Sequence, residues 1–162
     1  MPVIELELFV RAPCERVFDL SRSIDLHVRT AEGTAERAVA GVTTGLVELN
    51  DEVTWSARHF GVRQRLTARI TQFDRPRHFR DSMVRGAFAR FDHDHLFEEW
   101  EGGCRMVDRF DFDAPLRPLG RFAERLFLSR YMRRFLARRC QILKEVAESD
   151  EWQRYLQGVE DC

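Results

Sequence analysis

Hydrophobic and polar residues alternate along most of the first two thirds of the chain. Residues 4–10 place an aliphatic side chain at every second position, with a glutamate or a phenylalanine between. Because successive side chains of a strand point to opposite faces, this pattern predicts a half-buried first strand. Similar patterns predict strands over residues 34–40, 46–60, 62–73, 78–85, 87–100 and 104–113. A break near Asn50 and Asp51 is an alternative for the long second segment of this series.

Helical patterns occupy two other parts of the chain. Pro13 opens a short helix, PCERVFDLS, and Ser23 can cap a second one, SIDLHVRT. From Leu119 the period of the apolar positions changes from 2 to 3.6, which predicts an amphipathic helix of about thirty residues, roughly 45 Å long. Its apolar stripe comprises Phe122, Leu126, Met132, Phe135, Leu136, Cys140, Leu143 and Ala147.

Nearby residues define the ends of the long helix. Pro115 and Pro118 mark its start, and Gly158 lies beyond its end. The tail over 149–162 keeps Trp152 and Leu156 at helical spacing, so it either extends the helix or packs back on the domain.

Two glycine turns predict which side chains face each other. A turn at Phe60-Gly61 would pair Trp55 with Leu66 and would bring Gln64 and His59 to an otherwise apolar inner face.

A turn at Gly102-Gly103 would pair the next two strands in the same way. His93 would then face Phe112, His95 would face Phe110, and Phe97 would face Asp108. This face is mostly aromatic, yet it holds two histidines and an aspartate. Unpaired polar groups are costly in a sealed core, so we expect a cavity here. In the strand over 78–85, Phe79 and Met83 favour an inward odd-numbered face, which would also turn Asp81 inward, but the turn near Gly86 does not fix this register.

Composition narrows the class of protein. The chain has 162 residues, 44% of them hydrophobic and 33% charged, with a formal net charge of -1. These values are typical of one soluble domain and give no reason to expect a nucleic-acid partner. No apolar run approaches the ~20 residues of a membrane span, and the first residues are too acidic for a signal peptide. The scattered cysteines are typical of reduced thiols, so we expect a cytoplasmic protein.

The order of strand, two short helices, antiparallel meander and long terminal helix resembles the START-like, or SRPBCC, helix-grip superfamily. The resemblance is closer to its bacterial polyketide cyclase/dehydrase-like ligand-binding proteins. It covers about residues 2–148 and is carried by DEVTWSARHFGVRQRLTARI, PRHFRDSMVRGAFARFDHDHLFEEWEGG and VDRFDFDAPLRPLG. It implies an α+β fold in which six or seven curved antiparallel strands wrap around the long helix. We therefore expect a domain over 1–148 and a helical tail over 149–162.

The resemblance also implies a cavity between the sheet and the long helix. Proteins of this superfamily hold apolar or amphipathic small molecules there. The residues expected to line it, with the last two closing it from the long helix, are Trp55, His59, Gln64, Met83, Phe91, His93, His95, Phe97, Asp108, Phe110, Phe122 and Leu126.

His93-x-His95 admits several interpretations. Two imidazoles on one side of a strand can chelate a metal, but a further ligand is needed. Glu99 lies on the same face, and His59 or Asp108 could contribute only through folding. Hydrogen bonding to neighbours or to the ligand is favoured, so no metal and no cofactor are expected. Asp108 could act as a general acid or base, although orienting a histidine is the favoured role.

These observations support one leading function and two alternatives. The leading prediction is a binding protein for a hydrophobic or amphipathic small molecule such as a lipid, polyketide, quinone or aromatic metabolite. The first alternative is a cyclase/dehydratase-type enzyme that uses a His–Asp pair. The second is a protein-interaction module or homodimer, supported by the arginine-rich strand surface (Arg63, Arg65 and Arg69) and by the tail.

Overall fold

The computed structural model describes residues 2–113 and 121–157, with the side chains of 121–125 excepted. The predicted start of the long helix at Pro115 and Pro118, and its stop at Gly158, lie outside the described residues. The elements, in chain order, are β1 (Val3–Val10), α1 (Cys14–Ser21), α2 (Ile24–Thr30), a 3-10 turn (Glu32–Thr34), β2 (Arg37–Gly41), β3 (Glu52–His59), β4 (Val62–Asp74), β5 (His78–Arg85), β6 (Arg90–Trp100), β7 (Gly103–Asp113), α3 (Arg121–Glu148), a second 3-10 turn (Asp150–Trp152) and α4 (Gln153–Leu156).

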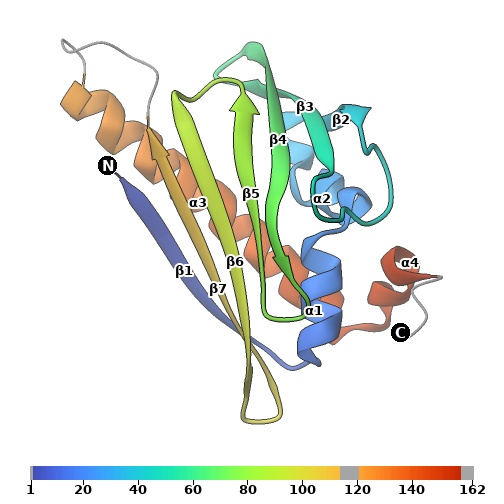
Figure 1. The fold of residues 1–162 in the computed structure, drawn as a ribbon. Coiled ribbons are helices and arrows are strands. Elements are labelled where there is room, and N and C mark those ends of the chain that lie inside the picture. The colour runs from blue at the N-terminus through green and yellow to red at the C-terminus, as the bar shows by residue number, and fades with distance from the viewer. Residues whose placement is uncertain (1, 114–120, 158–162) are drawn as a thin grey trace.

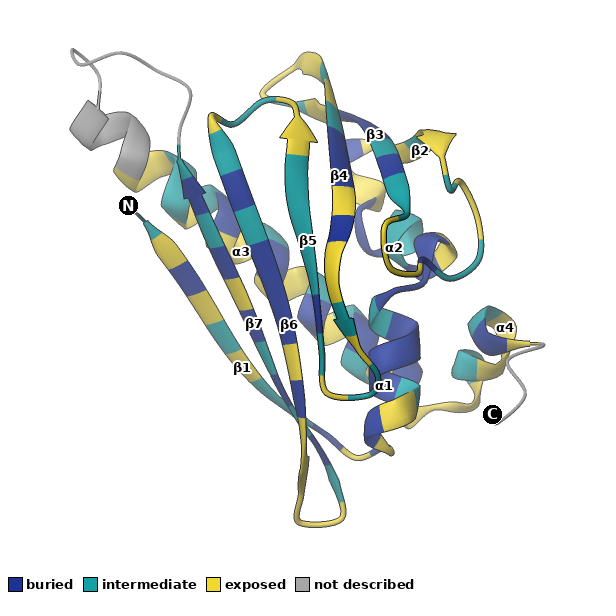
Figure 2. Cartoon of the chain, in the orientation of Figure 1, coloured by how far each residue is buried: buried dark blue, intermediate teal, exposed yellow. Residues whose placement is uncertain are grey.

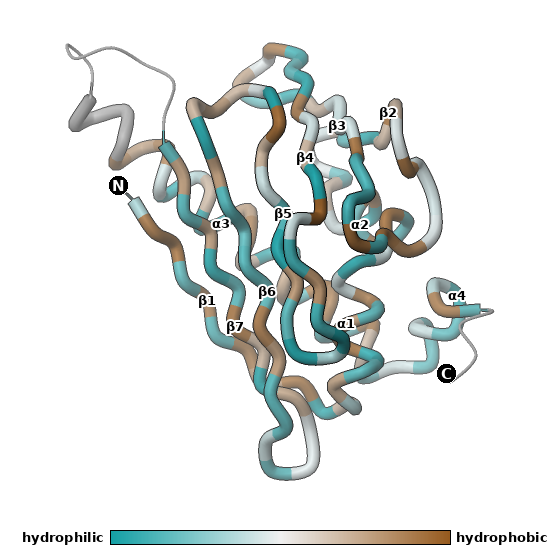
Figure 3. Tube along the Cα trace, viewed as in Figure 1, coloured by the Kyte–Doolittle hydropathy of each residue, from teal (hydrophilic) through white to brown (hydrophobic). Residues whose placement is uncertain are grey.

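In the described residues, seven strands form one curved sheet in the order β1-β7-β6-β5-β4-β3-β2, and all neighbours are antiparallel. The long helix α3 runs along one face of this sheet, and α1 and α2 lie toward one end of the same face (Figure 1). The alternation of hydrophobic and polar residues along β1 appears in Figure 3. The α+β helix-grip architecture expected from the sequence is therefore confirmed.

The short helices begin as their sequences predict. Pro13 is the residue before α1, and the Ser23 side chain accepts a hydrogen bond from the Leu26 backbone N–H at the start of α2. The segment expected as a strand over 46–60 forms strand structure only from Glu52. Asn50 just before it has a φ of 71°, which is incompatible with an extended strand. The alternative of a break near Asn50 is thus confirmed.

The turn between β3 and β4 has the predicted register. Phe60 and Gly61 both have positive φ values, as a type I′ hairpin turn requires, and Trp55 pairs with Leu66. The exposed side of β4 carries Arg63 and Arg65, as expected.

The predicted register between β6 and β7 is wrong by two residues. The turn residues with positive φ are Glu101 and Gly102, and His95 therefore pairs with Asp108 and His93 with Phe110. Gly103 lies outside the turn, and a glycine is required there because β1 passes close to its backbone. A Cβ atom placed there would lie 2.4 Å from the carbonyl oxygen of Val10 in β1. Because the shift is an even number of residues, each side chain keeps the face that the sequence predicted.

Two apolar clusters fill the space between the sheet and the helices. One surrounds Phe18 of α1 and includes Phe79 and Phe97; the other includes Phe91 and Phe110 and packs against α3. Figure 2 shows the buried positions alternating with less buried ones along β6. His93 and His95 stand between the two clusters on this strand. The strand therefore passes from one apolar cluster to the other through a polar segment.

The tail packs back on the domain. Leu156 is buried, and the guanidinium of Arg16 lies 4.3 Å from the ring centre of Trp152. Arg29 of α2 donates a hydrogen bond of 3.0 Å to the Tyr155 hydroxyl. Of the two alternatives for the tail, the structure shows packing back over the described residues. Among those residues, no helix is both long and apolar enough to cross a membrane.

Candidate functional site

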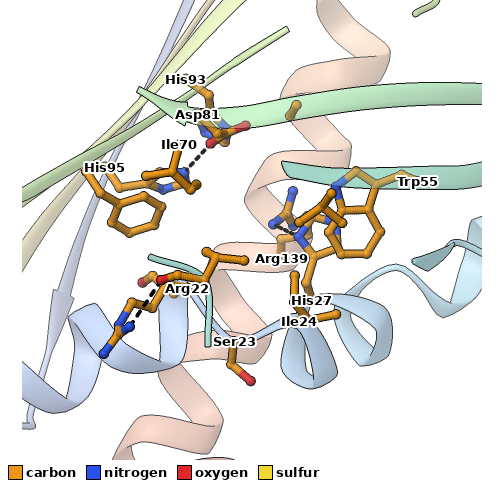
Figure 4. A pocket seen from close by; sticks show the side chains of 15 residues that line it. Arg22, Ser23, Ile24, His27, Trp55, Ile70, Asp81, His93, His95 and Arg139 are labelled. Carbon is orange, nitrogen blue, oxygen red and sulfur yellow. Dashed lines mark hydrogen bonds and ion pairs between the residues drawn. The ribbon is translucent and has the colours of Figure 1, made fainter. Parts of the chain in front are cut away.

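Three adjoining cavities lie between the sheet and the helices, and all of them are lined by His27, His93 and Arg139. The largest has a volume of about 110 Å³, the second about 60 Å³ and the third about 30 Å³. Figure 4 shows the second cavity, with His93 and His95 at one side and Trp55, His27 and Arg139 at the other. The three cavities therefore share parts of their walls.

The largest cavity has an apolar end. Phe91 and Phe110 are adjacent on β6 and β7, with ring centres 5.2 Å apart, and Phe88 packs edge-on against both. Met132 and Leu136 of α3 line the opposite side. Strand alternation and the helical stripe thus supply the two walls of one cavity.

The polar end of this cavity is organised by His27 and Glu36. The Arg139 guanidinium donates a hydrogen bond of 2.7 Å to Nδ1 of His27. Nε2 of His27 therefore carries the proton and donates it to Oε1 of Glu36 at 3.2 Å. The ring of His27 also stacks on Trp55, with ring centres 3.9 Å apart. These contacts fix both the orientation and the tautomer of His27.

His27 and Glu36 differ in their charge at neutral pH. Burial, together with the positive charge of Arg139, lowers the pKa of His27. Burial by itself would raise the pKa of Glu36, but contact with His27 and the charge of Arg139 lower it. His27 is thus neutral and Glu36 ionised at neutral pH. The second carboxylate oxygen of Glu36, Oε2, is buried and has no hydrogen-bond partner among the described residues.

His59 lines the same cavity. Its Nδ1 atom forms a hydrogen bond of 2.6 Å with the hydroxyl of Tyr131 on α3. Burial lowers the pKa of His59, so this imidazole is neutral at neutral pH. The contact links the tip of β3 to the long helix.

The two histidines of β6 lie between two aspartates. Nε2 of His93 donates to Oδ1 of Asp108 at 2.8 Å, and Nε2 of His95 donates to Oδ1 of Asp81 at 3.2 Å. Nδ1 of His95 also lies 2.8 Å from Asp108, but it is out of line for a hydrogen bond, so that contact is electrostatic. The thiol of Cys140 on α3 lies 3.7 Å from the other oxygen of Asp108.

This arrangement holds a charge inside the domain. Burial opposes protonation of His95, but the adjacent carboxylates of Asp108 and Asp81 outweigh it and raise the pKa of His95 to about 9. Burial acts in the opposite direction on Asp108, yet His93 and His95 hold the pKa of its carboxyl well below the usual value. The pKa of Asp81 is lowered for the same reasons. An imidazolium between carboxylates is therefore the resting state at neutral pH.

Comparison with known proteins identifies the family of this chain. The family model described as "polyketide cyclase / dehydrase and lipid transport" matches residues 1–148. The chain belongs to this family. No curated protein matches the sequence.

Solved structures of this family's fold are similar over most of the chain. TTHA0849 from Thermus thermophilus has a TM-score of 0.73 at 19% identity, covering 89% of this chain and 95% of its own. A START superfamily protein from Mycobacterium smegmatis has a TM-score of 0.68 at 8% identity, covering 90% and 97%. The ginseng major latex-like protein 151 from Panax ginseng has a TM-score of 0.65 at 10% identity, covering 91% and 98%. At these identities the similarity shows the fold.

Most residues that the sequence singled out for a helix-grip cavity lie at these three cavities. Those lining the largest are Trp55, His59, Gln64, Phe91, His93 and Phe110. His95 and Asp108 line the smaller ones.

The other expected lining residues lie elsewhere. Phe97 belongs to the closed cluster around Phe18, and Met83 is half-buried against the Phe91 cluster without lining the three cavities. Leu126 is 55% exposed and lines none of them. The side chain of Phe122 is outside the described residues. Glu99, considered as a metal ligand, is exposed.

Several polar residues of the site were not selected from the sequence. Asp81 was expected to point inward, which is confirmed, but it was not assigned to the site. Arg139 lies three residues after Leu136 and four before Leu143, so its place on the apolar stripe was a usable signal. His27 and Glu36 gave no comparable pattern.

Proposed function

We propose that the protein binds a small amphipathic molecule, with a ring-sized apolar body and a hydrogen-bond donor, in the cavity between the sheet and α3. The observation that carries this proposal is the unpartnered Oε2 of Glu36, a residue that lines the polar end of a cavity whose other end is walled by Phe88, Phe91 and Phe110. Small-molecule sites combine apolar walls with a few polar groups in this way. The family description, which names polyketide cyclases, dehydrases and lipid transport, supports the same class of ligand.

The volume of the cavity sets the size of the bound group. An engineered apolar cavity of about 150 Å³ holds benzene. The cavity here, at about 110 Å³, therefore suits one ring after small side-chain adjustments. A lipid, polyketide or quinone needs more space, which the two adjoining cavities would supply if they were joined to this one.

Glu36 determines the polarity of the ligand. A hydrogen bond to a charged group contributes about 1.5–3 kcal/mol, whereas a buried charge without its partner is costly. A phenol or alcohol relieves that cost by donating to Oε2, and a carboxylate ligand would be repelled. The site therefore selects neutral or cationic donors over purely apolar rings.

Calorimetric titration with phenol and with toluene tests this proposal. We expect phenol to bind about 10-fold or more tightly than toluene, and Glu36→Gln to remove most of that preference. The matched control is Glu32→Gln, which changes an exposed glutamate four residues earlier. Absence of binding by both compounds, or equal affinities that Glu36→Gln leaves unchanged, would contradict the proposal.

A second candidate is an enzyme of the cyclase/dehydratase type. It is favoured by one observation: Asp81, His93 and His95 all line a cavity while the histidines keep their aspartate contacts. An imidazolium beside a bound carbonyl compound can donate a proton, and a neighbouring carboxylate can accept one. The required result is turnover of a cyclisable β-polyketone that His95→Gln abolishes while the near-UV circular dichroism of the fold is retained. Unchanged turnover in that variant rejects the role of His95.

A further inference from the structure

Asp81, His93 and His95 bring three metal-ligating atoms together at the wall of the second cavity. Oδ1 of Asp81 lies 3.2 Å from Nε2 of His95 and 3.7 Å from Nδ1 of His93. One donor atom of each of the three residues lies within 4.8 Å of the others. The three residues come from two neighbouring strands, β5 and β6, so the sheet itself holds the group in place.

These separations suit a first-row transition metal. Bonds of about 2.0–2.1 Å in tetrahedral geometry place donor atoms roughly 3.3 Å apart. The distances from Asp81 to the two imidazoles are within a few tenths of an ångström of that value. Two imidazole nitrogens and one carboxylate oxygen are a donor set typical of zinc, iron or cobalt and unlike the oxygen-only sets of calcium and magnesium.

The carboxylate of Asp108 lies on the far side of both imidazoles and accepts a hydrogen bond from one of them, His93, as the outer partner of a metal-bound histidine usually does. The nitrogens turned away from Asp81, Nε2 of His93 and Nδ1 of His95, each lie 2.8 Å from Oδ1 of Asp108. A carboxylate behind a ligating histidine fixes its ring and strengthens its donor nitrogen. Asp108 is only 3% exposed and is held on its other oxygen by the thiol of Cys140. One buried carboxylate thus orients the imidazole of His93 through a hydrogen bond and contacts His95 through its charge.

We propose that Asp81, His93 and His95 form a binding site for one divalent transition-metal ion, for example Zn²⁺, with Asp108 as the hydrogen-bonded outer partner of His93 and a negative charge beside His95. A divalent ion would balance the two carboxylate charges that the site brings inside the domain. The three ligands leave a coordination position open toward the cavity, which Arg139 also lines. The guanidinium favours a negatively charged or carbonyl oxygen at that position.

The sequence alone did not lead to this assignment. The residues considered there as the third ligand beside the two histidines were Glu99, His59 and Asp108. The first is exposed, and the structure puts Asp108 behind the histidines instead of beside them. Asp81 fills the missing place because β5 pairs with β6, with Asp81 directly opposite His93.

The test uses the full chain after treatment with a chelator, and Co²⁺ alone as the probe. We expect one Co²⁺ per chain, with the visible absorption of four- or five-coordinate cobalt, and displacement of Co²⁺ by Zn²⁺. Asp81→Asn and His93→Gln should abolish that spectrum, and Asp108→Asn should weaken binding by about 10–100-fold. The control is His78→Gln, which removes an imidazole on β5 that instead pairs with Asp94.

Each result decides the proposal. No stoichiometric Co²⁺ binding, the same affinity in Asp81→Asn, or thiolate charge-transfer absorption that points to cysteines would overturn it. Should His93→Gln fail to fold, Asp81→Asn still decides, because this half-buried carboxylate is replaced by a group of the same shape. The phenol titration is carried out on the chelator-treated protein. The metal site can therefore fail while ligand binding succeeds, and the reverse.

Discussion

The two ends of β6 differ in how the same kind of side chain is packed. At one end Phe97 meets Phe18 of α1, whose ring also contacts Phe73 and Phe79 at centre distances of 5.4 and 5.3 Å. At the other end Phe91 belongs to a cluster with Met132 and Phe135 of α3, and all three residues line the largest cavity. The first end is closed and the second contains a cavity. The same strand face therefore closes around Phe18 of α1 and leaves a cavity against α3.

The segment of β6 between the two ends, His93 to His95, is held by ion pairs between imidazoles and carboxylates. His93 and His95 are both about 5% exposed, and Asp108 is 3% exposed. They are tolerated because each carboxylate has an imidazole partner. Three kinds of packing thus follow one another along a single strand face, and each is expected to respond differently to substitution.

The largest effect is expected at the closed end. Phe18→Ala should lower the free energy of unfolding by about 3–5 kcal/mol, because a fully buried ring is lost and its three neighbours cannot refill the space. Urea denaturation measures this loss. Phe88→Ala is the comparison at the cavity, where the half-buried ring should cost clearly less. Equal losses of unfolding free energy in the two variants would contradict the difference in packing between the two ends.

In the charged segment, Asp108→Asn should lower the free energy of unfolding by about 3 kcal/mol. The substitution would leave the imidazolium of His95 without one of its carboxylates. Urea denaturation of the chelator-treated protein measures it. Asp94→Asn, on the same sheet but paired with the half-exposed Arg80, is the comparison and should cost less. A smaller loss for Asp108→Asn than for Asp94→Asn would show that this segment is not held by charge.

At the cavity end, Leu136→Phe should change the free energy of unfolding by no more than about 1 kcal/mol, because the added ring atoms enter existing space. The same substitution should abolish phenol binding by filling the cavity. Calorimetry and urea denaturation on one sample test both parts. A large destabilisation with phenol binding intact would mean that the space is not where the ligand binds.

The smallest effect concerns pH and His27. Its folded-state pKa is lowered from 6.5, so the unfolded chain binds a proton at higher pH than the folded protein does. The resulting stability is fully present above pH 6.5 and is lost as the pH falls through the folded-state value. Wild type should therefore lose stability relative to His27→Gln between about pH 7 and pH 5, measured by urea midpoints. A constant difference over that window would contradict a buried neutral imidazole.

Local patterns predicted much of this fold. Alternation placed β5 at its observed bounds, and the period change near Leu119 located α3. The turn at Phe60-Gly61 led to the right pairing of β3 with β4, since both residues take positive φ values. Each of these features depends on a few neighbouring residues, so short segments of the sequence are enough to predict it.

The register of β6 and β7 could not be obtained in the same way. Two adjacent glycines left the position of the turn ambiguous, and the choice depends on Gly103 lying against Val10 of β1, far away in the sequence. The sequence did determine which residues share the inner face, because an even shift preserves it. It did not determine which histidine meets which aspartate.

The site required the tertiary structure for the same physical reason. Sequence alone determined that His93, His95 and Asp108 lie on one inward, largely aromatic face. Side chains alternate along a strand, so this holds for every register that differs by an even number of residues. Only the tertiary structure brought Asp81 to the histidines and His27 and Arg139 to Glu36, because those contacts join different elements. The cavity itself also depends on the fold, since empty space is set by what the opposing helices fail to fill.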